Sequence, residues 1–388
     1  MKALQSVLVC GGQVGKFGRQ PESTLASLAA PVLKGTLAAT GIKPTDIEAA
    51  FVGNGFGGLL QNQETILGQV LLGGAGLGPI RIHNVKNACS SGSDAVHLAW
   101  SSIAYGQYDC VLVLGVEKMT HDDPKATMSA LASASDRQPT SAGRSVFMDL
   151  NSERAMRYME RYGATPKHFA MCVVKNRAHA LMNEMAAVHQ ALTVDEVLAD
   201  RTVVAPLTRA MCGGIADGAA SLLLVSESFA RRHGLKGARL AASAVEGGDA
   251  QRGDGPSVTA RCAQTAFEQA GLGPNDVSLA EVHDPTAPQE LLDIEDIGLC
   301  GPGEAFKLLE QQATSLGGRI PVNVSGGLTA RGHPVGATGV AQIVEIAEQV
   351  EGRAGKRQVT GAKVGLAQMA GGLLGDDSAV ATIHILTN

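Results

Sequence analysis

The 388-residue sequence lacks the features that mark secreted, membrane-spanning or nucleic-acid-binding proteins. Its seven cysteines include no Cys-x-x-Cys pair, which argues against a disulfide framework and a structural zinc site and predicts a reducing, cytoplasmic location. No apolar run approaches the ~18 residues of a membrane span. Basic and acidic residues, 32 and 37, are interspersed, so no affinity for nucleic acid or an anionic membrane is expected.

Aromatic residues are also scarce, at 3%, whereas glycines number 48. Small side chains allow helices and strands to approach closely, and glycines permit tight turns. The composition therefore favours a layered α/β protein with a large core. We expect no metal, because the histidines and cysteines show no ligand spacing. We also expect no permanently bound cofactor, since the run Gly11-Gly12-Gln13-Val14-Gly15 lacks the full glycine spacing of a dinucleotide-binding loop.

One segment of the chain occurs twice. Residues 41–54, GIKPTDIEAAFVGN, return at 271–284 as GLGPNDVSLAEVHD. Corresponding elements are predicted at 6–10 and 239–245 (strands), 25–39 and 259–270 (amphipathic helices), and 217–225 and 376–384 (a turn and a buried strand). The pattern predicts two related α/β halves, with a functional site where they meet.

Between the halves, the pattern changes to polar turns and short helices. We predict an inserted lobe at 118–205, an N-terminal half formed by 1–117 and 206–235, and a C-terminal half at 236–388. Eight of the eleven methionines lie between Met119 and Met185. Methionine fills irregular apolar surfaces, so these residues suit either a lid over an acyl pocket or a small helical core.

The candidate nucleophile is Cys89, in the run Lys86-Asn87-Ala88-Cys89-Ser90-Ser91-Gly92-Ser93. An apolar strand precedes it and a helical pattern follows, so its thiol is expected where a helix begins. Unpaired backbone N–H groups and the helix dipole lower a thiol pKa at such a position. The alternative is a small buried cysteine beside a tight turn.

Two further motifs carry histidines. In Asn323 to Gly339, glycines surround His333, an arrangement that brings backbone close to a ligand and fixes an imidazole able to accept a thiol proton. In the run Glu281-Val282-His283-Asp284-Pro285, a histidine and a carboxylate follow a predicted strand, where α/β sheets bind ligands. A hydrogen-bonded turn histidine and a structural His–Asp pair are the alternatives.

Together these motifs resemble the thiolase family over essentially the whole length, and within it the branch related to sterol carrier protein thiolases. The resemblance rests on the Cys89 run, on Gly332-His333-Pro334 with Gly336-Ala337-Thr338-Gly339, on the turn Asp217-Gly218-Ala219-Ala220, and on His283-Asp284. It implies a duplicated five-layer α/β/α/β/α fold with an inserted loop lobe that binds coenzyme A. It also implies dimers or tetramers.

The resemblance implies an acyltransferase that cleaves a 3-ketoacyl-CoA with coenzyme A, or runs the reverse condensation. Cys89 would attack the ketone, His333 would activate it, and an acyl group would remain on sulfur until the CoA thiol accepts it. One oxyanion would be stabilised by His333 and His283, and the other by the backbone N–H groups of Cys89 and Ala370. Gly332, Gly336, Gly371 and Gly372 would form the loops of the acyl and CoA site.

One departure from the family pattern affects the acid–base chemistry. Gln368 stands where most thiolases carry a second cysteine, and Pro285 stands where sterol-carrier-type relatives place theirs. His283, oriented by Asp284, is then the candidate for protonating the carbanion. Two alternatives stay open: a decarboxylating condensing synthase, and a thiolase-like retro-aldolase or scaffold working with a zinc-ribbon, OB-fold companion protein.

Overall fold

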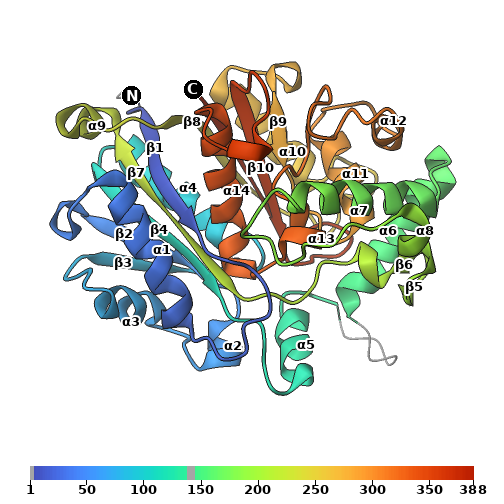
Figure 1. The fold of residues 1–388 in the computed structure, drawn as a ribbon, viewed down its shortest axis with the longest axis horizontal. Helices are drawn as coiled ribbons and strands as arrows, with labels where there is room; N and C mark the ends of the chain where they lie inside the picture. The colour runs from blue at the N-terminus through green and yellow to red at the C-terminus, as the bar shows by residue number, and fades with distance from the viewer. Residues whose placement is uncertain (1–3, 138–144) are drawn as a thin grey trace.

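The computed structural model describes residues 4–137 and 145–388; part of the predicted lobe, residues 138–144, lies outside them. Nine strands pair edge to edge (Figure 1). Their order is β3 (Arg81–Val85), β2 (Ala49–Gly53), β4 (Cys110–Glu117), β7 (Gly218–Ser226), β1 (Val7–Val14), β8 (Ala238–Gly247), β11 (Val380–Thr387), β10 (Val364–Gly371) and β9 (Leu279–Glu281).

The strand order confirms the internal repeat. The sequence β1-β7-β4-β2 on one side of the sheet is matched in order and direction by β8-β11-β10-β9 on the other. The two halves join where β1 pairs with β8, over only two residue pairs, Leu8 with Arg239 and Val9 with Ala238. In the second half, a single parallel bridge between Ala280 and Val322 lies at the position that corresponds to β3.

Helices complete five layers. The helices of the first half are α1 (Leu25–Thr40), α2 (Gly57–Gln61), α3 (Leu67–Gly74), α4 (Ser91–Ala104) and α9 (Glu227–His233). Those of the second are α10 (Val258–Ala270), α11 (Ala287–Asp296), α12 (Ala305–Glu310), α13 (Gly327–Arg331) and α14 (Val335–Val350). Short 3-10 turns are η1 (Pro44–Asp46), η2 (Arg209–Met211), η3 (Pro274–Asp276) and η4 (Gly355–Arg357).

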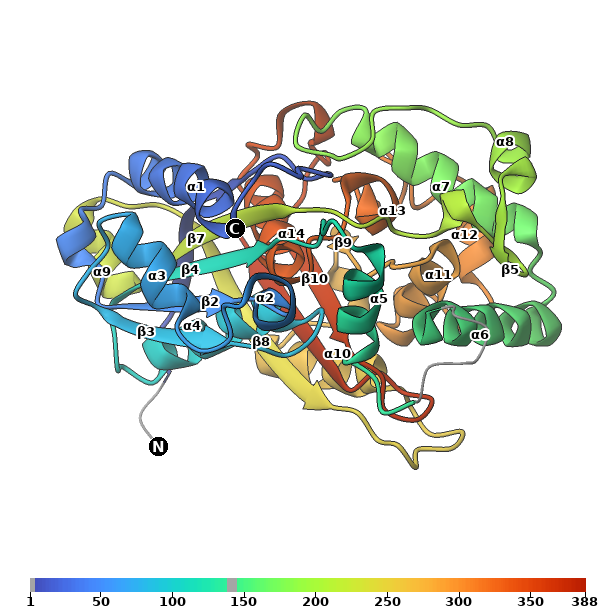
Figure 2. The ribbon, with the colours of Figure 1, turned by 90° about the horizontal axis from the view of Figure 1, so that it is seen from below.

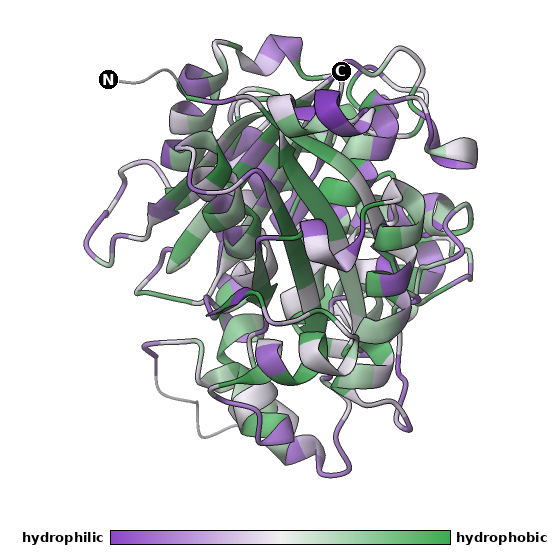
Figure 3. Ribbon diagram, turned by 90° about the vertical axis from the view of Figure 1, so that its left-hand side faces the viewer, coloured by the Kyte–Doolittle hydropathy of each residue, from purple (hydrophilic) through white to green (hydrophobic). Residues whose placement is uncertain are grey.

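Apolar side chains pack on both faces of each half of the nine-stranded sheet, which we call a half-sheet. One apolar cluster joins α1 and α3 to the outer face of the first half-sheet, and another joins α10 and α11 to the outer face of the second. Between them, α4 and α14 pack together and against strands of both halves. Figure 3 shows apolar residues concentrated along the strands. This arrangement is the predicted five-layer α/β/α/β/α fold.

Local sequence signals account for the helix boundaries. The hydroxyl of Thr24 accepts the backbone N–H of Ser27 at 3.1 Å, which caps the start of α1. Gly41 ends that helix with φ 68°, a left-handed conformation that favours glycine. Gly271, with φ 65°, ends α10 at the matching point of the second copy. The two repeats therefore share the glycine that ends the helix as well as the order of their strands.

The segment between the halves contains longer helices than the sequence suggested. Its elements are α5 (Pro124–Ala132), α6 (Val146–Tyr162), α7 (Pro166–Ala180), α8 (Val194–Ala199), β5 (Thr202–Val204) and β6 (Leu207–Thr208). Phe169, Cys172 and Val173 of α7 are fully buried in the same cluster as α10 and α11. Figure 2 shows α5 beside α2 and α6 beside α11. Part of this segment thus shares the core of the second half, while its boundaries at 118 and 205 remain a prediction.

Among the described residues, no helix is both long enough and apolar enough to cross a membrane.

Candidate active site

Cys89 lies in the turn between β3 and α4, directly before Ser90, the first flanking residue of that helix. The turn is held by the Ser91 side chain, which donates to the carbonyl of Ala88 at 2.6 Å and accepts the N–H of Asn87 at 2.8 Å. Ala88 takes φ 47°, so the chain reverses sharply just before the cysteine. The structure thus places the sulfur where the sequence expected it, at the start of a helix.

His333 occupies the corresponding place in the second half, between the Val322 bridge and α14. Its Nδ1 lies 2.8 Å from the Thr338 hydroxyl, which in turn donates to the carbonyl of Pro334 at 2.9 Å. Because that hydroxyl proton is used, the hydroxyl accepts from Nδ1–H, and the Nε2 of His333 is left with a free lone pair. This nitrogen is buried without a hydrogen-bond partner among the described residues, ready to accept a proton.

The three predicted side chains meet. The sulfur of Cys89 and one ring nitrogen each of His283 and His333 lie within 4.8 Å of one another. The two imidazole rings are 5.3 Å apart, centre to centre, at 64°. The thiol comes from the first half and both histidines from the second, so the site spans the junction of the copies. Thiol–imidazole proximity of this kind is what nucleophilic acyl transfer needs.

The three groups border one cavity, which we call the active-site cavity. Its wall is mostly apolar and is formed by Phe56, Cys89, Met119, Leu131, Ala134, Ser145, Phe147, Met148, Leu150, Asn151, Arg154, Gly213, Gly214, Ile215, His283, Pro285, Gln289, His333, Val335, Ala370, Gly371, Gly372, Leu373 and Ser378. The wall includes α6, so the segment between the halves covers the site. Of the eight methionines between Met119 and Met185, only Met119 and Met148 line this cavity, whereas Met159 and Met171 pack against the core.

The electrostatic setting of Cys89 differs from the sequence-based expectation. Burial raises the pKa of the Cys89 thiol to about 12, and the nearby carboxylate of Glu117 raises it further, against a smaller lowering by two backbone N–H groups. The start of α4 does not lower the thiol pKa below its ordinary value, because desolvation of a thiolate outweighs the local dipoles. The resting thiol is neutral, and its attack requires a base.

Burial keeps both imidazoles of the site neutral and makes each a weaker base than a free histidine. Burial lowers the pKa of His283 to about 3. Burial, followed by the charges of His283 and Arg331, lowers the pKa of His333 well below its ordinary value. Each ring is therefore neutral at physiological pH and presents a lone pair.

The backbone donors near the sulfur are those of Gly372 and of Cys89 itself. The N–H groups of Cys89 and Ala370, expected to stabilise the oxyanion of acyl transfer, remain a prediction. Ala370 lines the cavity, and Gly372, which bonds the sulfur, takes φ 66° at the turn after β10. Gly371 packs against the Cys89 turn, since a Cβ there would lie 3.0 Å from the Cys89 nitrogen.

Asp284 is not placed to orient His283. Its carboxylate accepts the backbone N–H of Leu328 at 2.7 Å and the side-chain amide of Asn176 at 3.0 Å. Among the hydrogen bonds of residues 4–137 and 145–388, none joins it to the His283 ring. Asp284 instead anchors α13, which leads into the His333 loop, and its predicted role is corrected accordingly.

Gln368 does not line the active-site cavity. It is fully buried, accepts the backbone N–H of His283 at 2.8 Å and donates to Thr259 at 3.3 Å. Gln368 thus fixes the backbone at His283. Ala370 and Gly371 of this strand line the cavity, and neither has an acid–base group.

Sequence reasoning missed two site residues. Thr338, which fixes the His333 ring, lies within the quoted Gly-Ala-Thr-Gly motif and could have been found from its five-residue spacing. Glu117, whose charge acts on Cys89, carries no motif. Its role depends on contacts over 62 and 219 residues of sequence.

Comparison with known families places nearly the whole chain in one family. A model described as the thiolase N-terminal domain matches residues 7–228, and one described as thiolase C-terminal domain-like matches residues 252–386.

The chain belongs to the thiolase family.

Similar proteins extend the assignment. The chain is 36% identical to the acetyl-CoA acetyltransferase of Methanothermobacter thermautotrophicus over 99% of this chain and 100% of that protein. It is 35% identical to the benzoylsuccinyl-CoA thiolase subunit BbsB of Thauera aromatica, over 92% of each. Human sterol carrier protein 2 is 33% identical over 94% of this chain and 69% of its own length. The chain is accordingly an acyltransferase of the thiolase family.

Solved structures share the fold. An aldolase, Ltp2-ChsH2(DUF35), has a TM-score of 0.82 at 21% identity, covering 100% of this chain and 99% of its own. Human mitochondrial 3-ketoacyl-CoA thiolase has a TM-score of 0.77 at 19% identity with the same coverage.

Proposed function

We propose that this thiolase-family acyltransferase transfers an acyl group between a 3-ketoacyl-CoA and coenzyme A through a thioester on Cys89. The observation that carries the proposal is the grouping of the Cys89 sulfur with ring nitrogens of His283 and His333 within 4.8 Å, at the wall of a mostly apolar cavity. A thioester suits a two-step transfer because a thiolate both attacks and departs readily.

The first step begins with proton transfer from the Cys89 thiol to Nε2 of His333. The sulfur then bonds to the C3 ketone carbon, and the C2–C3 bond breaks with its electron pair on C2. The proton on His333 passes to His283, whose ring is 5.3 Å away, and from there to C2. The products are acetyl-CoA and acyl-Cys89, and both imidazoles return to neutrality.

The second step returns the enzyme to its starting state. The incoming CoA thiol gives its proton to His333, its sulfur attacks the thioester carbonyl, and the Cys89 thiolate leaves and takes the proton back. We propose that the backbone N–H groups of Gly372 and Cys89 stabilise the carbonyl oxygen in this step, because both already point at the sulfur. The two histidines would stabilise the oxygen formed during carbon–carbon cleavage.

The segment over the cavity would receive the CoA ester. Its α5 and α6 regions contribute Leu131, Phe147 and Met148 to the cavity wall. These side chains favour an apolar acyl group by the same burial that stabilises a core. They do not define its length.

The experiment is a panel of 3-ketoacyl-CoAs, starting with acetoacetyl-CoA, incubated with free CoA. Thiolysis by the unaltered enzyme and its loss in Cys89→Ala is the expected result. His283→Ala is expected to slow proton exchange at C2 of acetyl-CoA by about 10²-fold or more, as loss of a general acid–base group does. A His283→Ala enzyme with unchanged exchange would contradict the relay.

A retro-aldolase reaction with a zinc-ribbon, OB-fold companion is a second candidate, favoured by the lack of a second thiol beside Ala370 in the cavity. A retro-aldol cleavage consumes no CoA thiol. Product formation that is independent of CoA and requires the companion protein would support this candidate over thiolysis.

A further inference from the structure

Glu117 is a fully buried carboxylate at the end of β4, bonded to the backbone of Phe56 in the wall of the active-site cavity. It accepts four hydrogen bonds. Three come from the first half: the side-chain amide of Asn54 at 2.9 Å and the backbone N–H groups of Gly55 at 2.7 Å and Phe56 at 3.1 Å. The fourth comes from the second half, the backbone N–H of Gly336 at 3.0 Å.

These donors belong to the two walls of the site. Phe56 lines the cavity and packs in one apolar cluster with Cys89, and Gly336 lies in the first turn of α14, three residues after His333. A Cβ on Gly55 would lie 3.5 Å from the carbonyl oxygen of Ala88. The segment 54–56 that Glu117 binds is therefore in contact with the turn that carries Cys89. One carboxylate therefore connects the segment beneath Cys89 to the helix that carries His333.

The bonding requires a carboxylate. Each of its oxygens accepts two donors: Oε1 accepts Asn54 and Phe56, and Oε2 accepts Gly55 and Gly336. A glutamine would direct an NH₂ group at two donors and leave buried N–H groups unpaired, which is costly. An aspartate keeps the charge but is shorter by one methylene.

We propose that Glu117 is a positioning residue that sets the separation between the Cys89 thiol and the His333 imidazole across the junction of the two halves. Burial raises the pKa of Glu117 to about 7, against a lowering by its four hydrogen-bond donors, so the carboxylate is charged above that pH. When charged, it also acts on the sulfur and opposes thiolate formation at Cys89.

The geometry of the Glu117 carboxylate and its charge have different effects on the site, which a merely structural residue would not show. Loss of the carboxylate geometry slows turnover, because the thiol and the imidazole no longer align. Loss of its charge alone makes the thiol more acidic, and therefore more reactive toward an alkylating agent. Turnover and thiol reactivity should thus change in opposite directions.

The test compares Glu117→Gln with Glu117→Asp. In both, kcat for thiolysis of acetoacetyl-CoA should fall about 10- to 100-fold with KM changed less than about threefold, because misplaced reacting groups cost rate rather than binding. Alkylation of Cys89 by iodoacetamide at about pH 9, where Glu117 is charged, is quantified on its peptide by mass spectrometry. It should rise about tenfold in E117Q, equivalent to one pKa unit. It should rise much less in E117D, which keeps the charge.

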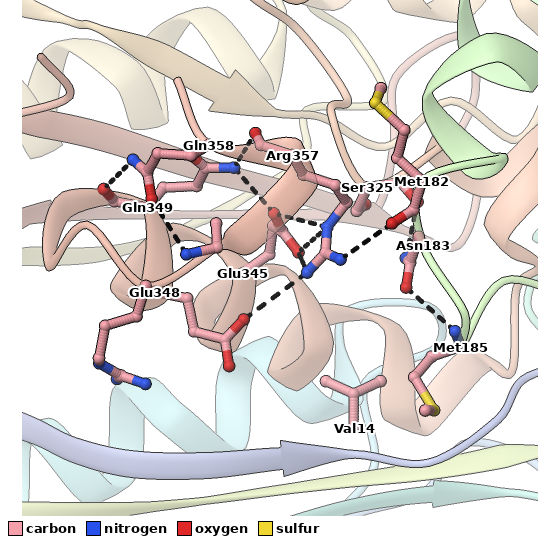
Figure 4. A network of polar contacts seen from close by, with 12 residues as sticks. Val14, Met182, Asn183, Met185, Ser325, Glu345, Glu348, Gln349, Arg357 and Gln358 are labelled. Atoms are coloured by element: carbon pink, nitrogen blue, oxygen red, sulfur yellow. Dashed lines mark hydrogen bonds and ion pairs between the residues drawn. The ribbon is translucent and has the colours of Figure 1, made fainter. Parts of the chain in front are cut away.

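Glu345 supplies a matched control on α14. It is also a buried glutamate, and its carboxylate pairs with the guanidinium of Arg357 at 2.8 Å. Figure 4 shows that Arg357 also contacts Glu348 and the carbonyl of Met182. Glu345→Gln should lower stability by loss of this ion pair and leave Cys89 alkylation unchanged. It controls for the general effect of removing a buried charge.

Two results would overturn the proposal. One is a folded E117Q with kcat within about twofold of the unaltered enzyme; the other is alkylation that falls in parallel with kcat. If E117Q does not fold, Asn54→Ala removes one donor and should lower kcat in the same direction by a smaller factor, and an N54A enzyme with unchanged kcat would overturn the proposal as well.

The measurement of kcat rests on the proposed thiolysis, whereas the measurement of Cys89 alkylation needs no substrate. An unaltered enzyme that cleaves no 3-ketoacyl-CoA would refute the proposed function alone. The contrast in alkylation between E117Q, E117D and E345Q would still decide the role of Glu117.

Discussion

At the scale of single residues, the site consists of a neutral thiol and two neutral imidazoles that charge only during turnover. Burial places the thiol pKa at about 12 and that of His283 at about 3. A buried ion pair would have to be desolvated at all times, whereas a neutral triad avoids that cost until substrate enters. The chemistry is thus supplied by geometry and proton transfer rather than by a resident thiolate.

This view predicts the pH dependence of thiol reactivity without substrate. Because the pKa of Cys89 lies near 12, the thiolate fraction at lower pH is small and rises tenfold for each unit of increasing pH. Alkylation of Cys89 by iodoacetamide should therefore increase about tenfold per unit from about pH 7 to about pH 9. A rate that levels off near pH 7 would show an acidic thiol instead.

Thr338 should control the orientation and the tautomer of His333. Thr338→Val keeps the shape of the side chain and removes the oxygen that accepts Nδ1–H. We expect kcat for acetoacetyl-CoA thiolysis to fall about 10- to 100-fold with little change in KM, since a general base loses its alignment. Thr338→Ser retains the hydroxyl and should stay within about threefold; equal losses in both variants would point to packing instead.

Sequence motifs predicted the residues that meet at the site but not those that hold them. Cys89 and His333 stand in runs of small residues and His283 follows a predicted strand, and those local patterns sufficed to name them. Asp284, Gln368 and Glu117 act through partners 44 to 219 residues away, and nothing in a single sequence states those pairings. The expected role of Asp284 was wrong for this reason.

At the scale of elements, the close approach of α4 and α14 brings the two halves of the site together. A Cβ on Gly92 would lie 2.2 Å from the carbonyl oxygen of Gly336. A Cβ on Gly336 would lie 2.6 Å from the carbonyl oxygen of Gly53. Backbone contacts this short allow no side chain, so these glycines set the distance between the helix that follows Cys89 and the helix that follows His333.

Gly92→Ala should therefore destabilise the protein. We expect a loss of about 1–3 kcal/mol in the free energy of unfolding, the cost of overpacking, measured by chemical denaturation. Gly73→Ala in α3 is the control, because nothing lies within 4 Å of its Cβ position. There alanine should be neutral or add up to about 1 kcal/mol. Equal effects at both positions would contradict this view of the interface.

Periodicity predicted the repeated elements well and the lobe poorly. The helix expected at 25–39 extends over Leu25–Thr40, and that expected at 259–270 over Val258–Ala270, because each buries a single apolar face. Helices α6 and α7, with 17 and 15 residues, were expected to be short. Buried polar residues of α7, including Lys175 and Asn176, bind partners in the second half and interrupt the apolar pattern.

At the scale of the whole molecule, duplication explains how one chain builds a two-part site. Cys89 and His333 each precede one of the two central helices, at equivalent points of the two copies. The junction of β1 and β8 is only two residue pairs long, so the two halves are held together mainly by the packing of α4 and α14. The site therefore depends on the packing of both halves around α4 and α14.

We expect copies of the chain to associate through the surface near β3. This strand forms one edge of the nine-stranded sheet, and Leu59, Ile66 and Val70 near it are 58%, 55% and 46% exposed. Apolar residues gathered beside an open edge favour association. Ile66→Asp should shift the protein toward monomers by light scattering, while Met156→Glu, 55% exposed on α6, should not. An unaltered protein that is monomeric at micromolar concentration would contradict the expected dimer or tetramer.

The measurement that tests the central claim most directly is capture of the acyl enzyme. The protein is incubated with acetoacetyl-CoA in the absence of free CoA, quenched in acid, digested and analysed by mass spectrometry. We predict an acetyl group on the peptide containing Cys89, absent in Cys89→Ala and discharged when CoA is added before the quench. An unmodified Cys89 peptide under conditions in which the substrate is cleaved would contradict the account.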